Sequence, residues 1–362
     1  MANTKRVFIS LGGAGNNILD SIQKETKLVD DTDDAVYINF AKTDISDKSK
    51  GHKCVLDAGG TGRDPNVGKK IAQENLPKIE KFLKEVVKPG KYNEIIVVAS
   101  LGGGTGSSLT PYVIDVLRNQ DVPISVFSVL PSTKEGVSTL PNAIKAFMNV
   151  YNNYVLYDKL NSFYLFDNEF YEKFGNYDSF DFKNINIEIA KTIEEILDES
   201  KVTRNSQGYQ SLDVNERKRV FFWGKGISDY CKIPLKKDTK VEDVRYASYI
   251  YSDKYKTNTA KSVAAQVLFR VGVTTAENNG LVVKANEVLN MLKKNFKNSA
   301  FYFGYTFDNS DLESDIEIRL IVNGLEVPKG FTSDAKKASK SVGKLKEENS
   351  DFSVSDDIDL NF

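Results

Sequence analysis

Short apolar runs alternate with longer periodic segments in the first half of the chain. The short runs are rich in β-branched and aromatic residues, which is typical of strands, and they span Val7–Leu11, Ala35–Phe40, Glu94–Ser100, Pro123–Leu130 and Ser162–Phe166. The segments between them predict helices at Asn17–Thr26, Val67–Val87 and Thr110–Asn119, and Pro77 is expected to bend or divide the second helix. Such alternation predicts an α/β fold with a mainly parallel sheet, whose ligands bind at the carboxyl ends of the strands.

The second half of the chain has a different pattern. A long amphipathic helix is predicted at about Phe182–Glu199, because apolar residues recur there at helical spacing: Ile185, Ile189, Ile193, Ile196 and Leu197. Further helices are predicted at Val214–Trp223, Ala260–Leu268 and 281–296. Two strands follow, Ala300–Phe307 and Ile316–Leu325, with the hydrophilic stretch Asp308–Ser314 as the turn between them. This pattern predicts a smaller α+β second domain.

The chain is therefore expected to divide into residues 1–180, a central helix and connection at 181–205, a second domain at 206–331 and a tail at 332–362. The tail is basic and then acidic, with few apolar residues, so burial cannot offset the entropy of ordering it and we expect it to be disordered. Two interpretations stay open: a solubilising end, or an interaction tail with a small apolar anchor at Ile358, Leu360 and Phe362.

Composition excludes several classes of site. The chain has 362 residues, and 49 Lys+Arg against 50 Asp+Glu leave a net charge of −1, which excludes the overall basic field of a dedicated nucleic-acid binder. Cys54 and Cys231 are too few and too far apart for a disulfide scaffold or a thiolate metal cluster, and the single His52 excludes a multi-histidine metal site. No apolar run approaches the ~20 residues of a membrane span, which predicts a soluble cytosolic protein.

Two glycine-rich loops of the first half could approach a phosphate. The loop Gly12–Asn17 follows the first strand and opens a helix, whose N-terminal N–H groups favour an anion; a tight structural turn explains it equally well. It fails the dinucleotide fingerprint, because Ile18 occupies the third glycine position and Asn39 stands where an acid would hold the ribose. The loop Gly59–Lys70 is not a P-loop, since Lys70 stands where Ser or Thr should bind magnesium, but it can still cover a phosphate.

A third loop, Leu101–Ser108, carries the strongest signal. Three consecutive glycines expose successive N–H groups that can form an anion-binding nest, and Thr105, Ser107 and Ser108 add hydroxyl groups. A structural turn alone would not need so many glycines, because each one destabilises the folded chain.

The three loops together resemble the tubulin/FtsZ superfamily. GGGTGSS resembles the signature GGGTGSG or GGGTGTG, with Ser108 in place of the last glycine; GGAGNN resembles GGGGNN; and GGTGRDPNVGKK resembles GAGANPEVGRKAA. The loops occur in the family's order and spacing, and the resemblance covers about residues 5–325. It implies a tubulin/FtsZ-like fold that binds GTP or GDP with Mg²⁺.

The resemblance also implies particular nucleotide contacts. Asn39 matches the Asn of the family's second loop, Glu135 lies in the loop that approaches the ribose, and Asn168 and Asn186 match amides that contact guanine, with Asn184 as a competitor. An isolated Asn also suits a cap or a turn. The family's Arg three positions after Gly136 is Thr139 here. The implied nucleotide-binding set is Gly12, Gly13, Ala14, Gly15, Asn16, Asn17, Asn39, Gly60, Thr61, Gly62, Gly102, Gly103, Gly104, Thr105, Gly106, Ser107, Glu135, Asn168 and Asn186.

Hydrolysis needs an oriented water, and the three loops supply no obvious carboxylate for it. In the family this group comes from the next subunit, through an N-x-D-x-x-D loop. Here Ser211–Glu216 stands at the corresponding place, and Asp213 and Glu216 are spaced to share one face of a starting helix. The resemblance implies a catalytic role for both, whereas the local pattern suits a helix cap equally well.

The resemblance favours a GTP-hydrolysing filament protein of the plasmid and phage (TubZ-type) branch, assembling head to tail with itself and positioning DNA through a DNA-bound adaptor at the C-terminal tail, without direct sequence-specific DNA contacts. Alternatives within the family are an FtsZ-like division filament and a phage-spindle protein. A dinucleotide-dependent oxidoreductase and a non-hydrolysing structural filament are the alternatives from other classes.

Overall fold

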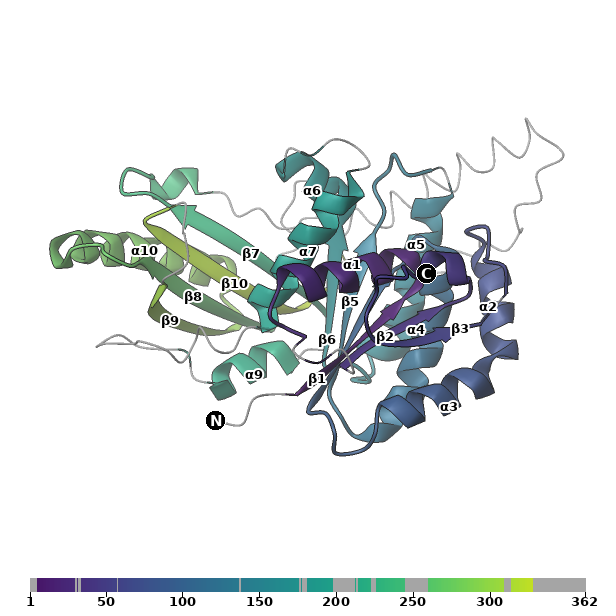
Figure 1. Ribbon diagram of the computed structural model, residues 1–362. Coiled ribbons are helices and arrows are strands. Elements are labelled where there is room, and N and C mark those ends of the chain that lie inside the picture. Colours follow the sequence, from purple (N-terminus) through teal and green to yellow (C-terminus); the bar gives the residue numbers. More distant parts are fainter. Residues whose placement is uncertain are drawn as a thin grey trace. The chain divides into compact units, whose positions relative to one another are not determined.

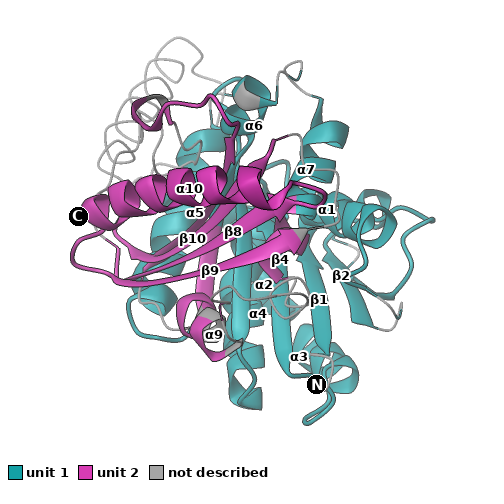
Figure 2. Cartoon of the chain, turned by 90° about the vertical axis from the view of Figure 1, so that its left-hand side faces the viewer, with its two compact units in different colours: residues 1–160, 165–191, 329–362 teal, residues 161–164, 192–328 magenta. Residues whose placement is uncertain are grey.

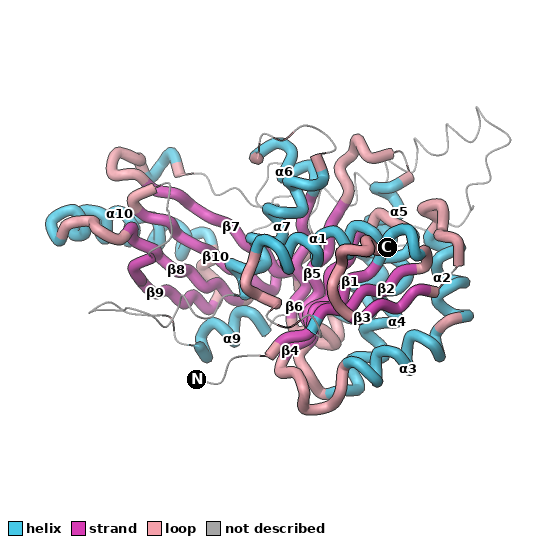
Figure 3. Tube along the Cα trace, in the orientation of Figure 1, coloured by secondary structure: helices cyan, strands magenta, loops and turns pink. Residues whose placement is uncertain are grey.

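The computed structural model describes residues 5–29, 31, 34–56, 58–136, 138–175, 177, 181–197, 212, 214–222, 226–244, 260–308 and 314–327. Figure 1 shows these residues as ribbons, and Figure 3 separates their helices, strands and loops by colour. The chain divides into two compact units: unit 1 comprises residues 1–160, 165–191 and 329–362, and unit 2 comprises residues 161–164 and 192–328 (Figure 2).

Unit 1 contains a parallel sheet with the strand order β3-β2-β1-β4-β5. Its strands are β1 (Arg6–Leu11), β2 (Ala35–Asn39), β3 (His52–Val55), β4 (Glu94–Ser100) and β5 (Ile124–Leu130). Every residue of β2 and β5 is buried, as are nearly all of β1 and β4, so both faces of the sheet are covered. The parallel pairing registers Phe8 with Ala35 and Ile96. The predicted α/β class is confirmed.

The helices of unit 1 begin at the glycine loops. Helix α1 (Gly12–Glu25) and helix α4 (Gly104–Leu117) start inside their loops, several residues before the positions that apolar periodicity predicts. The predicted division near Pro77 is confirmed: α2 (Pro65–Glu74) and α3 (Leu76–Val86) meet at Asn75. The N-terminal turns of α1 and α4 therefore consist of nearly bare backbone.

Unit 1 has further short elements besides this sheet and these helices. They are the short helices η2 (Lys42–Asp44) and η3 (Arg118–Gln120), α5 (Thr139–Val150), η4 (Tyr151–Val155) and α6 (Asn168–Phe174). Strand β6 (Ser162–Asp167) has residues in both units, as does helix α7 (Phe182–Leu197). All five apolar residues that predicted α7 are buried, among them Ile189 and Ile193 with no exposed surface.

Unit 2 contains a mixed sheet with the order β7-β10-β8-β9. Strand β10 (Ile316–Leu325) lies antiparallel between β7 (Ile227–Leu235) and β8 (Ser262–Arg270), whereas β9 (Ala300–Asp308) is parallel to β8. Helix α10 (Thr275–Asn295) connects the parallel pair, and α9 (Val214–Phe222) contacts β8 and β10. The short helix η5 (Val241–Asp243) completes the described elements of this unit.

The predicted helix at Ala260–Leu268 is wrong, because this segment forms β8. Its residues are almost all buried, since the strand lies between β10 and β9. A short apolar run that is buried on both faces shows no hydrophobic periodicity, so the sequence pattern cannot distinguish a strand from a helix. Pairing with the neighbouring strands then overrides the helix propensity of its alanines. The strands β9 and β10 are as predicted but are not neighbours, since β8 separates them.

Several predictions fall outside the described residues: the end of the connection after Leu197, Asp213, the centre of the turn after Asp308, and the tail from 332. Within the described residues, no helix has both the length and the apolar character needed to cross a membrane. Both cysteines are buried and free.

Candidate functional site

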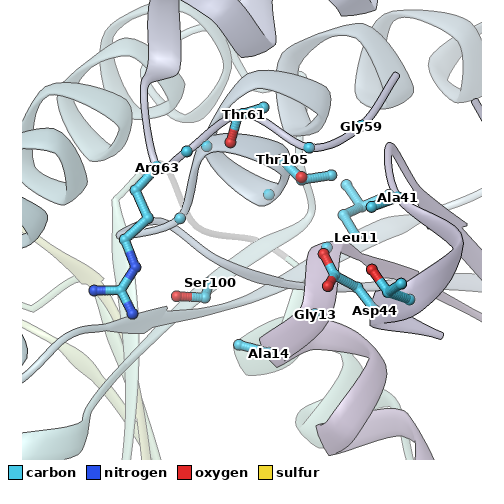
Figure 4. Close-up of a pocket in the computed structure, with 17 residues that line it drawn as sticks. Leu11, Gly13, Ala14, Ala41, Asp44, Gly59, Thr61, Arg63, Ser100 and Thr105 are labelled. Atoms are coloured by element: carbon cyan, nitrogen blue, oxygen red, sulfur yellow. The ribbon is translucent and has the colours of Figure 1, made fainter. Parts of the chain in front are cut away.

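A pocket of about 330 Å³ lies in unit 1, at the carboxyl ends of β1 and β4, where the alternation of strands and helices predicts a ligand (Figure 4). It is lined by all three glycine loops and by the segment that follows β2. The lining residues are Leu11, Gly12, Gly13, Ala14, Ala41, Thr43, Asp44, Gly59, Gly60, Thr61, Gly62, Arg63, Ser100, Gly103, Gly104, Thr105 and Gly106.

Backbone forms much of the pocket wall. Gly12 has a φ of +76°, and a Cβ added there would lie 3.0 Å from the backbone nitrogen of Gly106, so the first and third loops touch. At Gly103 an added Cβ would meet nothing within 4 Å. The N-terminal turns of α1 and α4 thus meet at one cavity, where their unpaired N–H groups and partial positive charge favour an anion.

Two other glycines bring the helices close to the sheet. A Cβ on Gly15 would lie 2.6 Å from the carbonyl oxygen of Val98, and one on Gly106 would lie 2.4 Å from that of Ser100. Both oxygens belong to β4, so these glycines let α1 and α4 pack directly on its backbone. Gly15 does not line the pocket, and its observed role is in packing.

The hydroxyl groups of the third loop divide between two tasks. Thr105 lines the pocket, whereas the hydroxyls of Ser107 and Ser108 donate to backbone carbonyls of the first turn of α4. Ser108 also donates to the carbonyl of Pro65, at 3.1 Å, which ties α4 to the start of α2. The serine that replaces the last glycine of the family signature therefore joins two loops.

The asparagines of the predicted set do not line the pocket. The buried Asn16 accepts a hydrogen bond from Ser10 Oγ at 2.8 Å and donates to the carbonyl of Asp44 at 3.1 Å, which places the segment after β2 beside the first loop. Asn39 accepts from the backbone N–H of Ala41 at 3.3 Å. Its buried Nδ2 has no hydrogen-bond partner among the described residues, and Asn17 is exposed on α1.

The structure joins two other predicted residues directly. Glu135 Oε1 accepts hydrogen bonds from Asn168 Nδ2 and from the backbone N–H of Ser132, each at 2.8 Å. Asn168 is the first residue of α6, which is capped by the carboxylate of Asp167. Glu135 and Asn168 therefore form a cluster, although neither lines the pocket.

The remaining predicted residues do not line the pocket. Gly102 lies against Pro131 and Thr139, and Asn186 lies half-buried on α7. Its competitor Asn184 is exposed, and its side chain donates at 2.7 Å to Asp181, the residue directly before α7. Glu216 lies half-buried in the first turn of α9.

Sequence reasoning missed two charged lining residues. Asp44 reaches the pocket from η2 and Arg63 reaches it from the second loop, and the two lie on opposite sides in Figure 4. Among the described lining residues, these are the only carboxylate and the only cation. The sequence could have indicated Arg63, because it directly follows the glycines of the second loop and precedes the helix start at Asp64-Pro65.

Comparisons with known proteins agree with this geometry. Residues 5–173 match the model of the Tubulin/FtsZ family, GTPase domain. This segment contains all three loops and the whole pocket, so the pocket lies within the part of the chain that is similar to that GTPase domain.

Individual relatives extend the comparison. The Tubulin-like protein CetZ of Methanothrix thermoacetophila is 29% identical over 155 residues, which cover 38% of this chain and 41% of the relative. The chain thus spans less than half the length of that curated relative. Among solved structures, a GTPγS-bound protofilament of CetZ2 from Haloferax volcanii has a TM-score of 0.71 at 20% identity, covering 95% of this chain and all of the other.

GDP-form protofilaments of TubZ from Bacillus thuringiensis serovar israelensis give a TM-score of 0.73 at 16% identity, covering 96% of this chain and 94% of the other. Both likenesses extend over nearly the whole chain, so the tubulin/FtsZ fold is confirmed.

Proposed function

We propose that the chain binds GTP in the pocket of unit 1, hydrolyses it and assembles head to tail into filaments. The observation that carries the proposal is the meeting of the N-terminal turns of α1 and α4 at one glycine-walled cavity within the segment that is similar to a Tubulin/FtsZ family GTPase domain. Their N–H groups suit the phosphates of a nucleotide. The buried, unpartnered Nδ2 of Asn39 is a further donor at the end of β2.

The residues present fit a magnesium ion held mainly by phosphate oxygens and water. Within the described residues no group of three or more His, Cys, Asp or Glu could hold a metal, but Asp44 offers a carboxylate to the pocket and Thr43 and Thr105 lie in its lining. Mg²⁺ commonly uses one or two carboxylates together with waters and phosphates. When bound, it would supply positive charge that offsets the charge of the phosphates.

Hydrolysis is proposed to be completed by the neighbouring subunit, through Asp213 and Glu216. The support is the half-buried position of Glu216 at the start of α9, three residues after Asp213, which favours both carboxylates sharing one face. A contact that joins the GTP face of one subunit to the α9 face of the next is heterologous, and such a contact continues as an open filament. CetZ2 and TubZ were both solved as protofilaments.

A finer proposal is that the filament moves or positions plasmid or phage DNA, with a DNA-bound adaptor at the C-terminal tail. Its support is the likeness to TubZ at a TM-score of 0.73, together with the basic and then acidic tail composition. The curated relatives include CetZ proteins and FtsZ, so an FtsZ-like division filament is the alternative.

Sedimentation with parallel phosphate release tests the proposal. The wild-type chain is expected to pellet with GTP but not with ATP, and to stay polymeric longer with GTPγS. The Asp213→Ala variant is expected to pellet with GTP while releasing phosphate at least about 100-fold more slowly, as for the loss of a group that stabilises the transition state. Asp238→Ala, which removes the same charge from an exposed turn of unit 2, should keep wild-type turnover.

Two results would contradict the proposal: a pelleted fraction that is the same with and without GTP, or equal rates of phosphate release in wild type and Asp213→Ala. Spectral binding of NADH without pelleting would favour an oxidoreductase instead. Assembly with GTP but without phosphate release would favour a structural filament.

A further inference from the structure

Arg63 occupies an unusual position in the pocket wall. It is the only cation among the described lining residues, and it is exposed. Its backbone adopts a φ of +66°, a left-handed conformation that non-glycine residues rarely adopt. Directly after it, Asp64 caps α2 by accepting the N–H of Asn66 at 2.8 Å, so the end of the loop is fixed immediately beyond Arg63.

The backbone and the side chain of Arg63 both form hydrogen bonds with residues outside the pocket lining. Its carbonyl accepts a hydrogen bond from Asn142 Nδ2 of α5 at 3.2 Å. Its guanidinium Nη1 donates to the backbone carbonyl of Glu135 at 3.3 Å, a long bond to a neutral acceptor. Glu135 in turn holds Asn168 through its carboxylate. Arg63 therefore connects the glycine loop over the pocket to the cluster of Glu135 and Asn168.

The loop that holds Glu135 has a cation of its own, Lys134, whose Nζ lies 3.4 Å from the carboxylate of the buried Glu172. The position three residues after Gly136 is Thr139, which is buried. Its methyl group would lie 2.8 Å from a Cβ on Gly102, so the side chain packs against the third loop. Arg63 brings a further positive charge to the Glu135 loop, from the second glycine loop.

We propose that Arg63 recognises the terminal phosphate of the bound nucleoside triphosphate, exchanging the carbonyl of Glu135 for a phosphate oxygen. A guanidinium carries several N–H donors, and a hydrogen bond between two charged groups is about twice as strong as one to a neutral carbonyl. The exchange brings the second loop onto the phosphates and releases the loop that holds Asn168. Arg63 is thereby the residue that distinguishes a triphosphate from a diphosphate. This inference rests on the proposed nucleotide site.

Equilibrium titration of the full chain with GTP and with GDP tests this role. Arg63→Ala is expected to raise the Kd for GTP about tenfold or more, the loss of one charged hydrogen bond, and the Kd for GDP by less than about threefold. Arg63→Lys, which keeps the charge without the fork of donors, should fall between wild type and Arg63→Ala. Lys69→Ala removes the same charge from an exposed position on α2 outside the pocket lining, and should leave the ratio of the two constants unchanged.

The ratio of the two constants decides the outcome. An unchanged ratio in Arg63→Ala, whether both constants rise together or neither rises, would overturn the inference while leaving nucleotide binding intact. A wild-type chain that binds neither GTP nor GDP would instead refute the proposed function. Matching thermal unfolding of wild type and Arg63→Lys excludes misfolding as the cause of the intermediate ratio.

Discussion

The pocket of unit 1 and a charged network of unit 2 use polar groups in different ways. In unit 1, bare backbone at the starts of α1 and α4 faces a cavity of about 330 Å³. In unit 2, charged side chains face one another: Glu195 contacts Lys232 at 2.5 Å and Arg319 at 3.7 Å, and it accepts a hydrogen bond from Tyr230 at 2.8 Å. The pocket of unit 1 presents backbone donors to a ligand, whereas the network around Glu195 in unit 2 pairs its charged groups with one another.

The network in unit 2 lies between the end of α7 and the sheet. Arg319 on β10 also contacts Glu317 at 2.7 Å, and its side chain is only 8% exposed. Burial, followed by the nearby charge of Glu195, raises the pKa of Tyr230 well above its ordinary value, so its hydroxyl stays a donor to Glu195. Such a network fixes the position of an element, since a buried charge without its partners is costly.

The largest predicted effect separates Gly106, which lines the pocket and also packs against β4, from Gly103, which lines the pocket without such a contact. Gly106→Ala is expected to destabilise unit 1 by about 3 kcal/mol, because the new Cβ would lie 2.4 Å from the carbonyl of Ser100 on β4. Gly103→Ala should leave unfolding unchanged, because its Cβ meets nothing within 4 Å, and should instead weaken GTP binding. Thermal unfolding followed by circular dichroism measures the first effect, and titration measures the second.

If Gly106→Ala and Gly103→Ala both unfolded at the wild-type temperature, the two glycines would not differ in packing. That result would show that α4 can shift away from β4 without loss, and that Gly106 serves only the ligand.

A smaller loss is expected in unit 2. Glu195→Gln keeps the volume and the acceptor for Tyr230 but removes the charge between Lys232 and Arg319, and should cost about 2 kcal/mol. The control is Glu80→Gln on α3, whose partner Lys84 lies at 2.6 Å with both side chains well exposed. That change should cost under about 0.5 kcal/mol. Urea unfolding of both variants measures the difference, and equal losses would show that the network adds no stability.

Each unit contains one buried cysteine, so thiol labelling can follow the opening of each unit separately. Cys54 lies on the edge strand β3, and Cys231 lies on β7. Burial raises the pKa of both thiols, so a thiol reagent should label them only when their unit opens. At ten times its Kd, GTP should slow labelling of Cys54 about tenfold and that of Cys231 much less. Peptide mass spectrometry measures both rates in one sample; equal protection would mean that the units open together.

The smallest effect concerns the start of α10 and depends on pH. Glu277 accepts hydrogen bonds from the hydroxyl of Thr274 at 2.8 Å and from its backbone N–H at 3.0 Å, which lower the pKa of Glu277 below its ordinary value of 4.5. A lowered pKa adds stability above pH 4.5, which is lost as the pH falls through the folded value. The stability difference between wild type and Glu277→Gln should therefore shrink on acidification; a constant difference would show that charge contributes nothing at this cap.

The sequence could predict features that depend on local residues but not those that depend on contacts between distant segments. In unit 1 the strands, the division of helices near Pro77 and the three loops were readable, because each depends on local residues and turns. The orientation of Ser107 toward its own helix and the reach of Arg63 to Glu135 were not readable, because they depend on how distant loops meet. In unit 2 the strand β8 was mistaken for a helix, since its burial between two strands is a tertiary property.

Mixing two inactive variants tests most directly whether one subunit holds the nucleotide while its neighbour completes hydrolysis. Gly103→Asp places a carboxylate toward the open cavity, and should prevent GTP binding while keeping Asp213 and Glu216. Asp213→Ala should bind GTP but not hydrolyse it. Each variant alone is expected to release almost no phosphate, whereas the mixture should recover a substantial fraction of wild-type release. A mixture as inactive as its components, in which the two chains still co-pellet, would contradict the account.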